Sequence, residues 1–153
     1  MTGPGGRSMS THGGAIGDGA PMTAMHHVAM TVTDIDASIA WYKDVFGFEE
    51  LMRDDHFGDS GGYAVVLGPP DFSMAVVLNH HPTNGGESFD PTRTGLDHVG
   101  FVMPDRAAIV EFQARLNDKG VTNSPITDHE WGSSLNFRDP DQMQLQLICF
   151  AGM

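Results

Sequence analysis

The octapeptide His98-Val99-Gly100-Phe101-Val102-Met103-Pro104-Asp105 is the most informative part of this chain, because an earlier octapeptide repeats its pattern. The earlier one reads His27-Val28-Ala29-Met30-Thr31-Val32-Thr33-Asp34. Each copy begins His-Val, alternates apolar positions as a half-buried strand does, and reaches Asp seven residues after the His. The repeat indicates a duplicated unit. One histidine in each copy indicates a site built symmetrically between the two halves.

The segments that follow the two octapeptides also match each other. Each Asp is an expected N-cap for a helix with an apolar stripe, and a glycine ends each helix. The predicted helices are Asp34–Phe46, before Gly47, and Asp105–Lys119, before Gly120. Strand-like runs follow at Phe48–Arg53, Tyr63–Leu67 and Ser73–Asn79, and again at Val121–Ile126, Ser134–Phe137 and Met143–Phe150. Strand-helix-strand-strand-strand therefore occurs twice, which predicts an α+β fold of two tandem βαβββ modules.

The composition predicts a single domain that follows an N-terminal tail. Residues 1–24 are rich in Gly, Ser, Thr and Pro without an apolar period, so we expect a disordered tail. Residues 25–151 have the length of a single domain, with half one at 25–82 and half two at 95–150. The single cysteine, Cys149, argues against a disulfide framework or a cysteine-rich zinc site, and a reducing, cytoplasmic setting is expected.

The charge balance narrows the possible partners. The chain has 20 acidic and 8 basic residues, a net charge of −12, which argues against nucleic-acid binding through phosphate neutralisation. The charge serves solubility or, alternatively, complements a cationic ligand. No apolar run approaches the ~20 residues of a membrane helix, so no membrane partner is expected.

These motifs resemble the vicinal oxygen chelate superfamily. The resemblance rests on the His27-Val28 strand, on a helix that contains Trp41-Tyr42, and on its end at Phe46-Gly47-Phe48. It rests also on two further stretches. Gly95-Leu96-Asp97-His98-Val99 is similar to the start of the superfamily's fifth strand. Phe137-Arg138-Asp139-Pro140-Asp141 is similar to the start of the turn before the superfamily's eighth strand. The superfamily includes glyoxalase I, extradiol dioxygenases and the fosfomycin and bleomycin resistance proteins. The resemblance implies an open, cup-shaped eight-stranded sheet with a divalent metal ion on its floor.

The resemblance also implies where the metal ligands lie. It places them on the first and last strands of each half, and the first-strand positions are His27 and His98. Counting five residues from the Asp of each Pro-Asp turn gives Val76 and Gln146 for the last strands. We expect Val76 to face the cup as a substrate contact. His27, His98 and Gln146 would hold iron, manganese or zinc, although an amide brings no negative charge. Alternatively, both histidines are remnants of an ancestral site.

Further candidates lie on the rim of the expected cup. His80, four residues beyond Val76, is a candidate for a rim ligand or an acid–base group, or alternatively the start of a solvated loop. A second cluster contains His129, an acid–base candidate, with Trp131, Asn136 and Arg138 as expected substrate contacts. The superfamily's substrate contacts often come from this region, and ordinary surface is the alternative.

Two function classes follow from the resemblance. The first is a metal-dependent enzyme, dioxygenase-like or glyoxalase/lyase-like, in which two adjacent oxygens of a small substrate chelate the ion. Glyoxalase I itself fits less well, because both carboxylate positions are empty. The second is a metal-free protein that binds a drug or metabolite, as bleomycin resistance proteins do, and the −12 charge suits a cationic ligand. A homodimer is expected from the resemblance.

Overall fold

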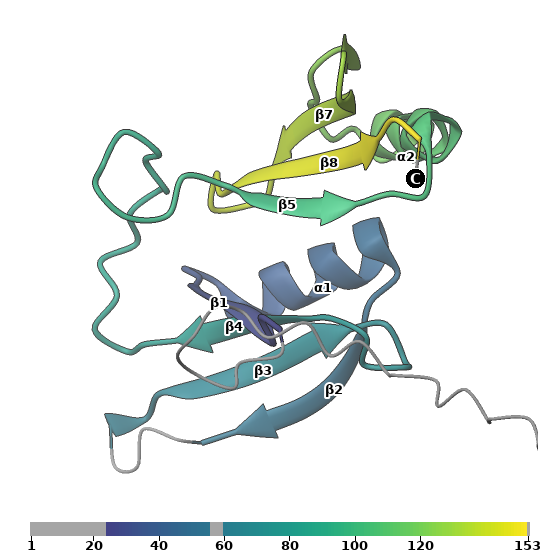
Figure 1. Cartoon of the computed structure of the whole chain (residues 1–153). Helices are drawn as coiled ribbons and strands as arrows, with labels where there is room; N and C mark the ends of the chain where they lie inside the picture. Colours follow the sequence, from purple (N-terminus) through teal and green to yellow (C-terminus); the bar gives the residue numbers. More distant parts are fainter. Residues whose placement is uncertain (1–23, 56–59, 153) are drawn as a thin grey trace, which may run out of the picture.

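The computed structural model describes residues 24–55 and 60–152 and shows two βαβββ modules (Figure 1). The first module contains β1 His27–Thr31, α1 Ile35–Phe46, β2 Glu49–Asp54, β3 Tyr63–Gly68 and β4 Ala75–His80. The second contains β5 Val99–Val102, α2 Arg106–Asp118, β6 Thr127–His129, β7 Gly132–Arg138 and β8 Gln144–Phe150. The predicted α+β duplication is confirmed. The predicted tail lies, apart from Ala24, outside the described residues.

Each module forms an open four-stranded sheet. The strand orders are β1-β4-β3-β2 and β5-β8-β7-β6. In each sheet the first strand lies at an edge and runs parallel to the last, while the other pairs are antiparallel. The first strand of each module, which follows or begins with the repeated histidine, therefore occupies the same position in both sheets.

The two helices begin and end where the sequence predicts. The side chains of Asp34 and Asp105 accept a hydrogen bond from the backbone N–H three residues on, at 3.0 and 2.8 Å. Gly47 ends α1 with φ 72°, and Gly120 follows α2 with φ 68°, a left-handed conformation in which only glycine escapes a Cβ clash. No helix in the described part of the chain is long and apolar enough to cross a membrane.

One predicted strand is wrong. Residues 121–126 make only an isolated bridge between Asn123 and Phe137, and β6 begins later, at Thr127. The polar groups of this segment bond partly to β7 and partly to a helix. The Ser124 N–H donates to the Asn136 carbonyl at 2.8 Å, whereas Gln113 of α2 donates to the Asn123 side chain and to the Ser124 carbonyl, both at 3.1 Å. Pro125 also has no N–H to give to a sheet.

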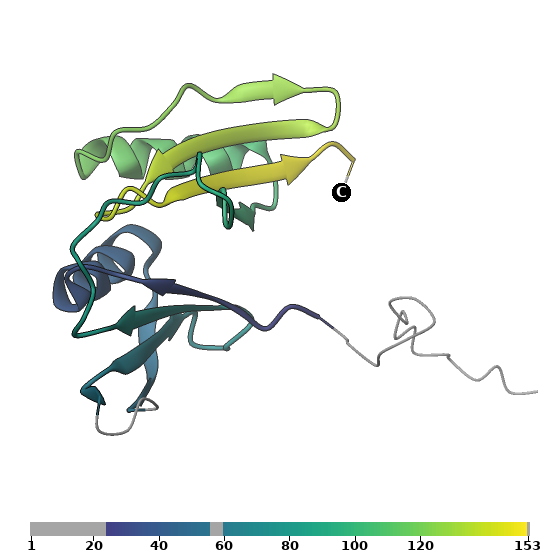
Figure 2. The ribbon, with the colours of Figure 1, turned by 90° about the vertical axis from the view of Figure 1, so that its left-hand side faces the viewer.

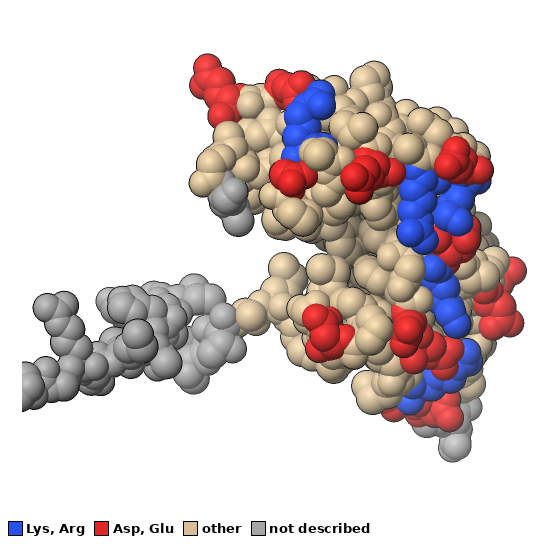
Figure 3. Space-filling view, turned by 90° about the vertical axis from the view of Figure 1, so that its right-hand side faces the viewer, with Lys and Arg blue, Asp and Glu red and all other residues tan. Residues whose placement is uncertain are grey.

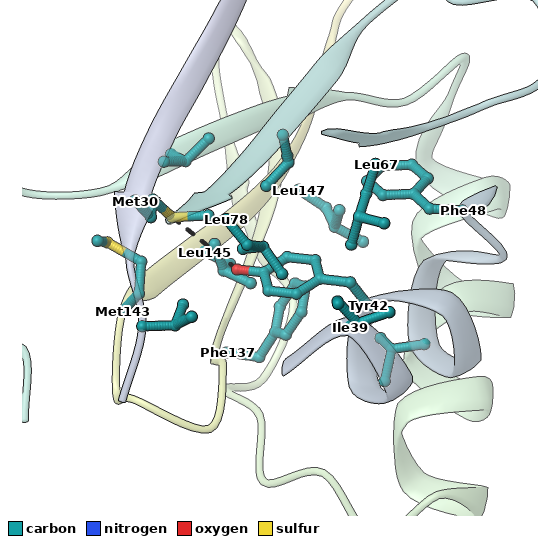
Figure 4. Close-up of a cluster of buried hydrophobic side chains, with 14 of the residues drawn as sticks. Met30, Ile39, Tyr42, Phe48, Leu67, Leu78, Phe137, Met143, Leu145 and Leu147 are labelled. Atoms are coloured by element: carbon teal, nitrogen blue, oxygen red, sulfur yellow. Dashed lines mark hydrogen bonds between the residues drawn. The ribbon is translucent and has the colours of Figure 1, made fainter. Parts of the chain in front are cut away.

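The hydrophobic core lies between the two sheets, and both modules contribute to it. α1 runs between the sheets in Figures 1 and 2. Tyr42 of α1 is fully buried among side chains of both halves, as Figure 4 shows. The ring of Phe46 packs against Phe101 of β5 and Phe112 of α2, with ring centroids 4.9 and 5.5 Å apart. Because the helix-covered faces of both sheets meet in this core, their helix-free faces, here called the outer faces, turn away from each other.

Polar contacts join the two modules. The Tyr42 hydroxyl donates to Asp139 at 2.9 Å, and Lys119 lies 2.6 Å from the Asp44 carboxylate. Burial raises the pKa of both Tyr42 and Asp139, so Tyr42 remains a hydrogen-bond donor. Figure 3 shows Lys and Arg side chains lying among acidic ones on the face that it draws, and a hollow between the halves. A cleft of about 290 Å³ lies between them, lined by Val28 and Phe101 among others.

Candidate functional site

The outer face of the first sheet carries an apolar cavity. Its volume is about 390 Å³, within the range of small-ligand sites. Its floor consists of small apolar side chains on β1, β3 and β4, and larger ones stand beside it; these are Ala29, Ala64, Val66, Val77, Met52 and Phe72. His27 lies at one end of this cavity. The histidine of the first copy is thus next to a site large enough for a small molecule.

Val76, the predicted substrate contact, lies on the opposite side of its strand. Its side chain is 2% exposed and belongs to the core beneath α1. The expectation that it faces the site is therefore wrong. Its neighbour Val77 lines the outer-face cavity instead. The fourth ligand position that the resemblance implies is thus occupied by the apolar side chain of Val77 and not by that of Val76.

The strand register explains this error. Gln146 pairs with Gly100 and Val77 pairs with Ala29, and each partner lies two residues after the repeated histidine. Gln146 comes five residues after Asp141 of its Pro-Asp turn, whereas Val77 comes six residues after Asp71 of the equivalent turn. The connection into β4 is one residue longer, and a shift of one residue moves a strand side chain to the other face.

His98 and Gln146 share the outer face of the second sheet. His98 directly precedes β5, and its Nδ1 lies 2.7 Å from the Asp97 carboxylate. That contact orients the ring and leaves Nε2 for a ligand, as carboxylate partners do for metal-binding histidines. Gln146 pairs with Gly100, and a Cβ built on that glycine would lie 3.9 Å from the Gln146 Oε1. Strand alternation places His98, Gly100 and Gln146 on one face.

The three predicted metal ligands do not come together in one chain. β4 and β5 point in opposite directions in Figure 1, and β1 is parallel to β4. The starts of β1 and β5, where His27 and His98 lie, are therefore on opposite sides of the molecule. They also belong to different outer faces. Among residues 24–55 and 60–152, no three His, Cys, Asp or Glu side chains are grouped to hold a metal ion. Two imidazoles and an amide oxygen suit a divalent ion chemically, but a single chain does not assemble them.

His80 lies far from His27. It is the last residue of β4, where its ring packs 5.1 Å from the ring of Tyr63. His27 pairs with Ala75 at the other end of the same strand. Five residues at ~3.3 Å each put roughly 17 Å between the two backbone positions. The structure therefore places His80 at the end of β4 that is far from His27.

The predicted cluster of the second half divides into two groups. His129 stacks on Trp131 with centroids 4.6 Å apart, and its Nε2 lies 3.2 Å from the Ser134 hydroxyl. Asn136 and Arg138 lie further along β7 and line a separate cavity of about 880 Å³, which neither His129 nor Trp131 lines. All four belong to the β6–β7 region, but only the first two touch each other.

Asp128 lies on β6, next to His129, and the pKa of its carboxyl group depends on the contacts between β6, β7 and α2. It accepts hydrogen bonds from Arg106 at 2.7 and 3.0 Å and from Ser133 at 2.7 Å. These donors lower its pKa from 3.8 to about 2, with the Arg106 bond as the largest cause. The contribution of Asp128 to stability is therefore present above pH 3.8 and lost as the pH falls through about 2.

We expect a carbon-detected NMR titration to show the Asp128 carboxyl with a midpoint near 2. Arg106→Gln removes the charged donor and should move the midpoint up towards 3.8, while Ser133→Ala should move it less. An unchanged midpoint in Arg106→Gln would contradict the bidentate pair.

The residues that the sequence missed lie mostly on the outer face of the first sheet. Ala29, Met52 and Val77 are ordinary strand residues, and nothing in their type marks a site. Phe72 has one available signal, since it follows Pro70-Asp71 as Gln142 follows Pro140-Asp141. The third residue is an aromatic one in the first turn and a polar one in the second, which indicates that the two halves differ at this point.

Comparison with known proteins agrees with this architecture. A crystal structure of a glyoxylase/bleomycin resistance protein/dioxygenase domain from Frankia sp. EAN1pec is 30% identical with a TM-score of 0.76, covering 85% of this chain and 99% of that one. Biphenyl-2,3-diol 1,2-dioxygenase 3 of Rhodococcus globerulus is 26% identical, covering 82% of this chain but only 63% of its own length.

The fosfomycin resistance protein FosX of Listeria monocytogenes, crystallised with manganese(II) and 1S,2S-dihydroxypropylphosphonic acid, has a TM-score of 0.63. It is 16% identical, covering 86% of this chain and 93% of that one, so the likeness concerns the fold alone. Some proteins of this fold thus bind a divalent metal. Residues 24–147 match the family described as the glyoxalase/bleomycin resistance protein/dioxygenase superfamily. With its two βαβββ modules and this match over most of its length, the chain belongs to that superfamily.

Proposed function

We propose that this protein is a metal-dependent enzyme that works as a homodimer on a small oxygenated substrate. Each site forms where the first module of one protomer meets the second module of the other. His27 comes from one protomer, and His98 and Gln146 come from the other. The reaction is of the dioxygenase or lyase class, and the ion is iron, manganese or zinc.

The observation that carries the proposal is the orientation of His98 beside Gln146 on an open sheet face. Asp97 holds the His98 ring at 2.7 Å, which suits a ligand more than a remnant histidine. His27 occupies the equivalent place on the other outer face, beside the apolar cavity. β1 and β5 are both edge strands in the described structure, so each has an edge open to a second chain. A two-fold dimer brings such separated faces together twice.

Different residues of the chain have different roles in such a site. His27, His98 and Gln146 would hold the ion, which would supply Lewis-acid chemistry to the substrate. The cavity next to His27 takes the body of the substrate and excludes water from it. His129 is the better placed acid–base candidate, because Trp131 and Ser134 fix its ring on the second outer face, whereas His80 lies far from His27.

A second candidate function is metal-free binding of a small molecule. The uncharged Gln146 and the apolar Val77 favour it, because neither position supplies the carboxylate that holds a divalent ion most tightly. The apolar cavity would then be the main part of the site.

A mixing experiment tests the shared site. His27→Ala and His98→Ala each damage every site of their own homodimer, so neither alone should bind manganese(II) by electron paramagnetic resonance. Refolding the two variants together should restore about a quarter of the wild-type sites, because half of randomly mixed dimers are heterodimers with one intact site of two.

The controls separate the outcomes. Each variant refolded alone should remain without manganese. If the wild type binds manganese but the mixture restores none, the shared site is wrong. If the wild type binds no divalent metal, the metal-free function replaces the enzyme.

A further inference from the structure

Two non-glycine residues within 24–55 and 60–152 have a positive φ, and they occupy equivalent turns. Phe72 has φ 55° and Gln142 has φ 68°. The N–H of Phe72 bonds to the Pro69 carbonyl at 2.9 Å, and that of Gln142 bonds to the Asp139 carbonyl at 3.0 Å. Each is the third residue of a Pro-Asp-X turn that leads into the last strand of its module.

The left-handed conformation disfavours an aromatic residue. A Cβ in this region approaches the following carbonyl, and bulky residues adopt it rarely. Burial does not compensate at Phe72, because its side chain is 46% exposed and lies outside the core. Strained positions of this kind cluster at active sites, ligand clamps and switch regions. The turn itself requires no aromatic ring, since Gln142 forms the equivalent turn without one.

The ring of Phe72 forms one side of the apolar cavity on the first outer face. It meets the His26 ring edge-on with centroids 5.4 Å apart. Met52, which is 54% exposed, lines the same cavity from β2. Two large exposed apolar side chains therefore stand beside a floor of alanine and valine, a surface that water solvates poorly.

The charges around the cavity indicate which ligands it accepts. Among the described residues, Asp54 is the one acidic residue that lines the cavity, and no Lys or Arg lines it. The chain as a whole carries −12. Apart from the divalent ion proposed beside His27, a negatively charged group here would meet no fixed positive partner among the described residues, and it would meet an unfavourable long-range field.

We propose that Phe72 is a specificity-determining residue, and that this cavity binds an aromatic or similarly flat apolar group that carries no negative charge. The proposal deepens the proposed function and rests on it for the place of the site. The strained turn holds the ring of Phe72 where it contacts the flat group of the ligand. Aromatic side chains contribute both contact area and a preferred stacking geometry to such binding.

The test uses the full chain and the neutral fluorophore N-phenyl-1-naphthylamine. Wild-type protein should bind it with a rise in fluorescence. Phe72→Gly should weaken binding at least roughly tenfold, the loss expected for a buried aromatic contact. Gln142→Gly is the matched control, because it makes the same change of backbone preference in the equivalent turn and should leave binding unchanged. Neither variant should lower the melting temperature, since glycine suits a positive φ.

Three results would overturn the proposal. The first is a wild type that does not bind the fluorophore. The second is equal affinity in Phe72→Gly, or an equal loss in Gln142→Gly. The third is that the anionic 1-anilinonaphthalene-8-sulfonate binds as tightly as the neutral fluorophore. These measurements need no metal, so a wild type that fails to bind manganese contradicts the enzyme proposal and leaves this one standing.

Discussion

Gln146→Glu is expected to tighten manganese(II) binding about ten- to a hundredfold, or ~1.4–2.7 kcal/mol at ~1.4 kcal/mol per decade. The change adds a negative charge directly against the ion, on the outer face that also carries His98. The Coulomb gain is large at short range, but desolvation of the new carboxylate removes part of it. Calorimetric titration of manganese, iron(II) and zinc into the apo protein measures the effect.

The controls for this prediction isolate the ligand position from net charge. Gln142→Glu makes the same charge change in the turn before β8 and should leave the metal affinity nearly unchanged. His27→Ala and His98→Ala should abolish binding in both the wild-type and the Gln146→Glu background. If neither the wild type nor Gln146→Glu binds any of the three metals, the metal-free binding protein is the better account.

Asp139→Ala is expected to lower the free energy of unfolding by about 3–5 kcal/mol. Asp139 is 3% exposed, and its carboxylate accepts hydrogen bonds from the Tyr42 hydroxyl and from the N–H groups of Asp141 and Met143, each at 2.9 Å. Alanine would leave these three donors without this partner, two of them in a buried place and that of Asp141 in a partly buried one. The bond to Tyr42 also joins α1 of the first module to the turn before β8, so its loss weakens the contact between the modules.

A matched variant tests whether hydrogen bonding is the cause. Asparagine is nearly isosteric with aspartate, so Asp139→Asn keeps an oxygen for the two backbone donors and presents an amide to the Tyr42 oxygen. It should cost about 1 kcal/mol, the usual net value of one hydrogen bond. Urea denaturation of the three proteins at one pH gives the comparison. Equal losses in the Asn and Ala variants would show that the carboxylate acts by charge.

The features that could be predicted from the sequence depend on neighbouring residues. Asp34 and Asp105 cap helices by bonds to N–H groups three residues away, and Gly47 ends α1 by its own backbone freedom. Alternation within β1 likewise assigns His27 and Ala29 to one face. Because these interactions close within one turn of chain, their pattern is visible in the sequence, and its repetition revealed the duplicated module. The strand predicted at 121–126 is wrong because some of the polar groups of this segment bond to α2, and strand propensity does not consider such bonds.

The composition of the site depended on pairings between distant parts of the chain. The partner of Ala29 is Val77 rather than Val76 because the turn at Phe72 is followed by one more residue than its counterpart, and only the paired strands reveal that shift. The placement of His27 and His98 on separate outer faces follows from burying the helix-covered faces of both sheets in one core. Apolar burial is non-directional, so a repeated apolar pattern specifies that each sheet has a buried face but not which element covers it. The three-dimensional packing of α1 between the sheets made that choice, and it thereby separated the two histidines within one chain.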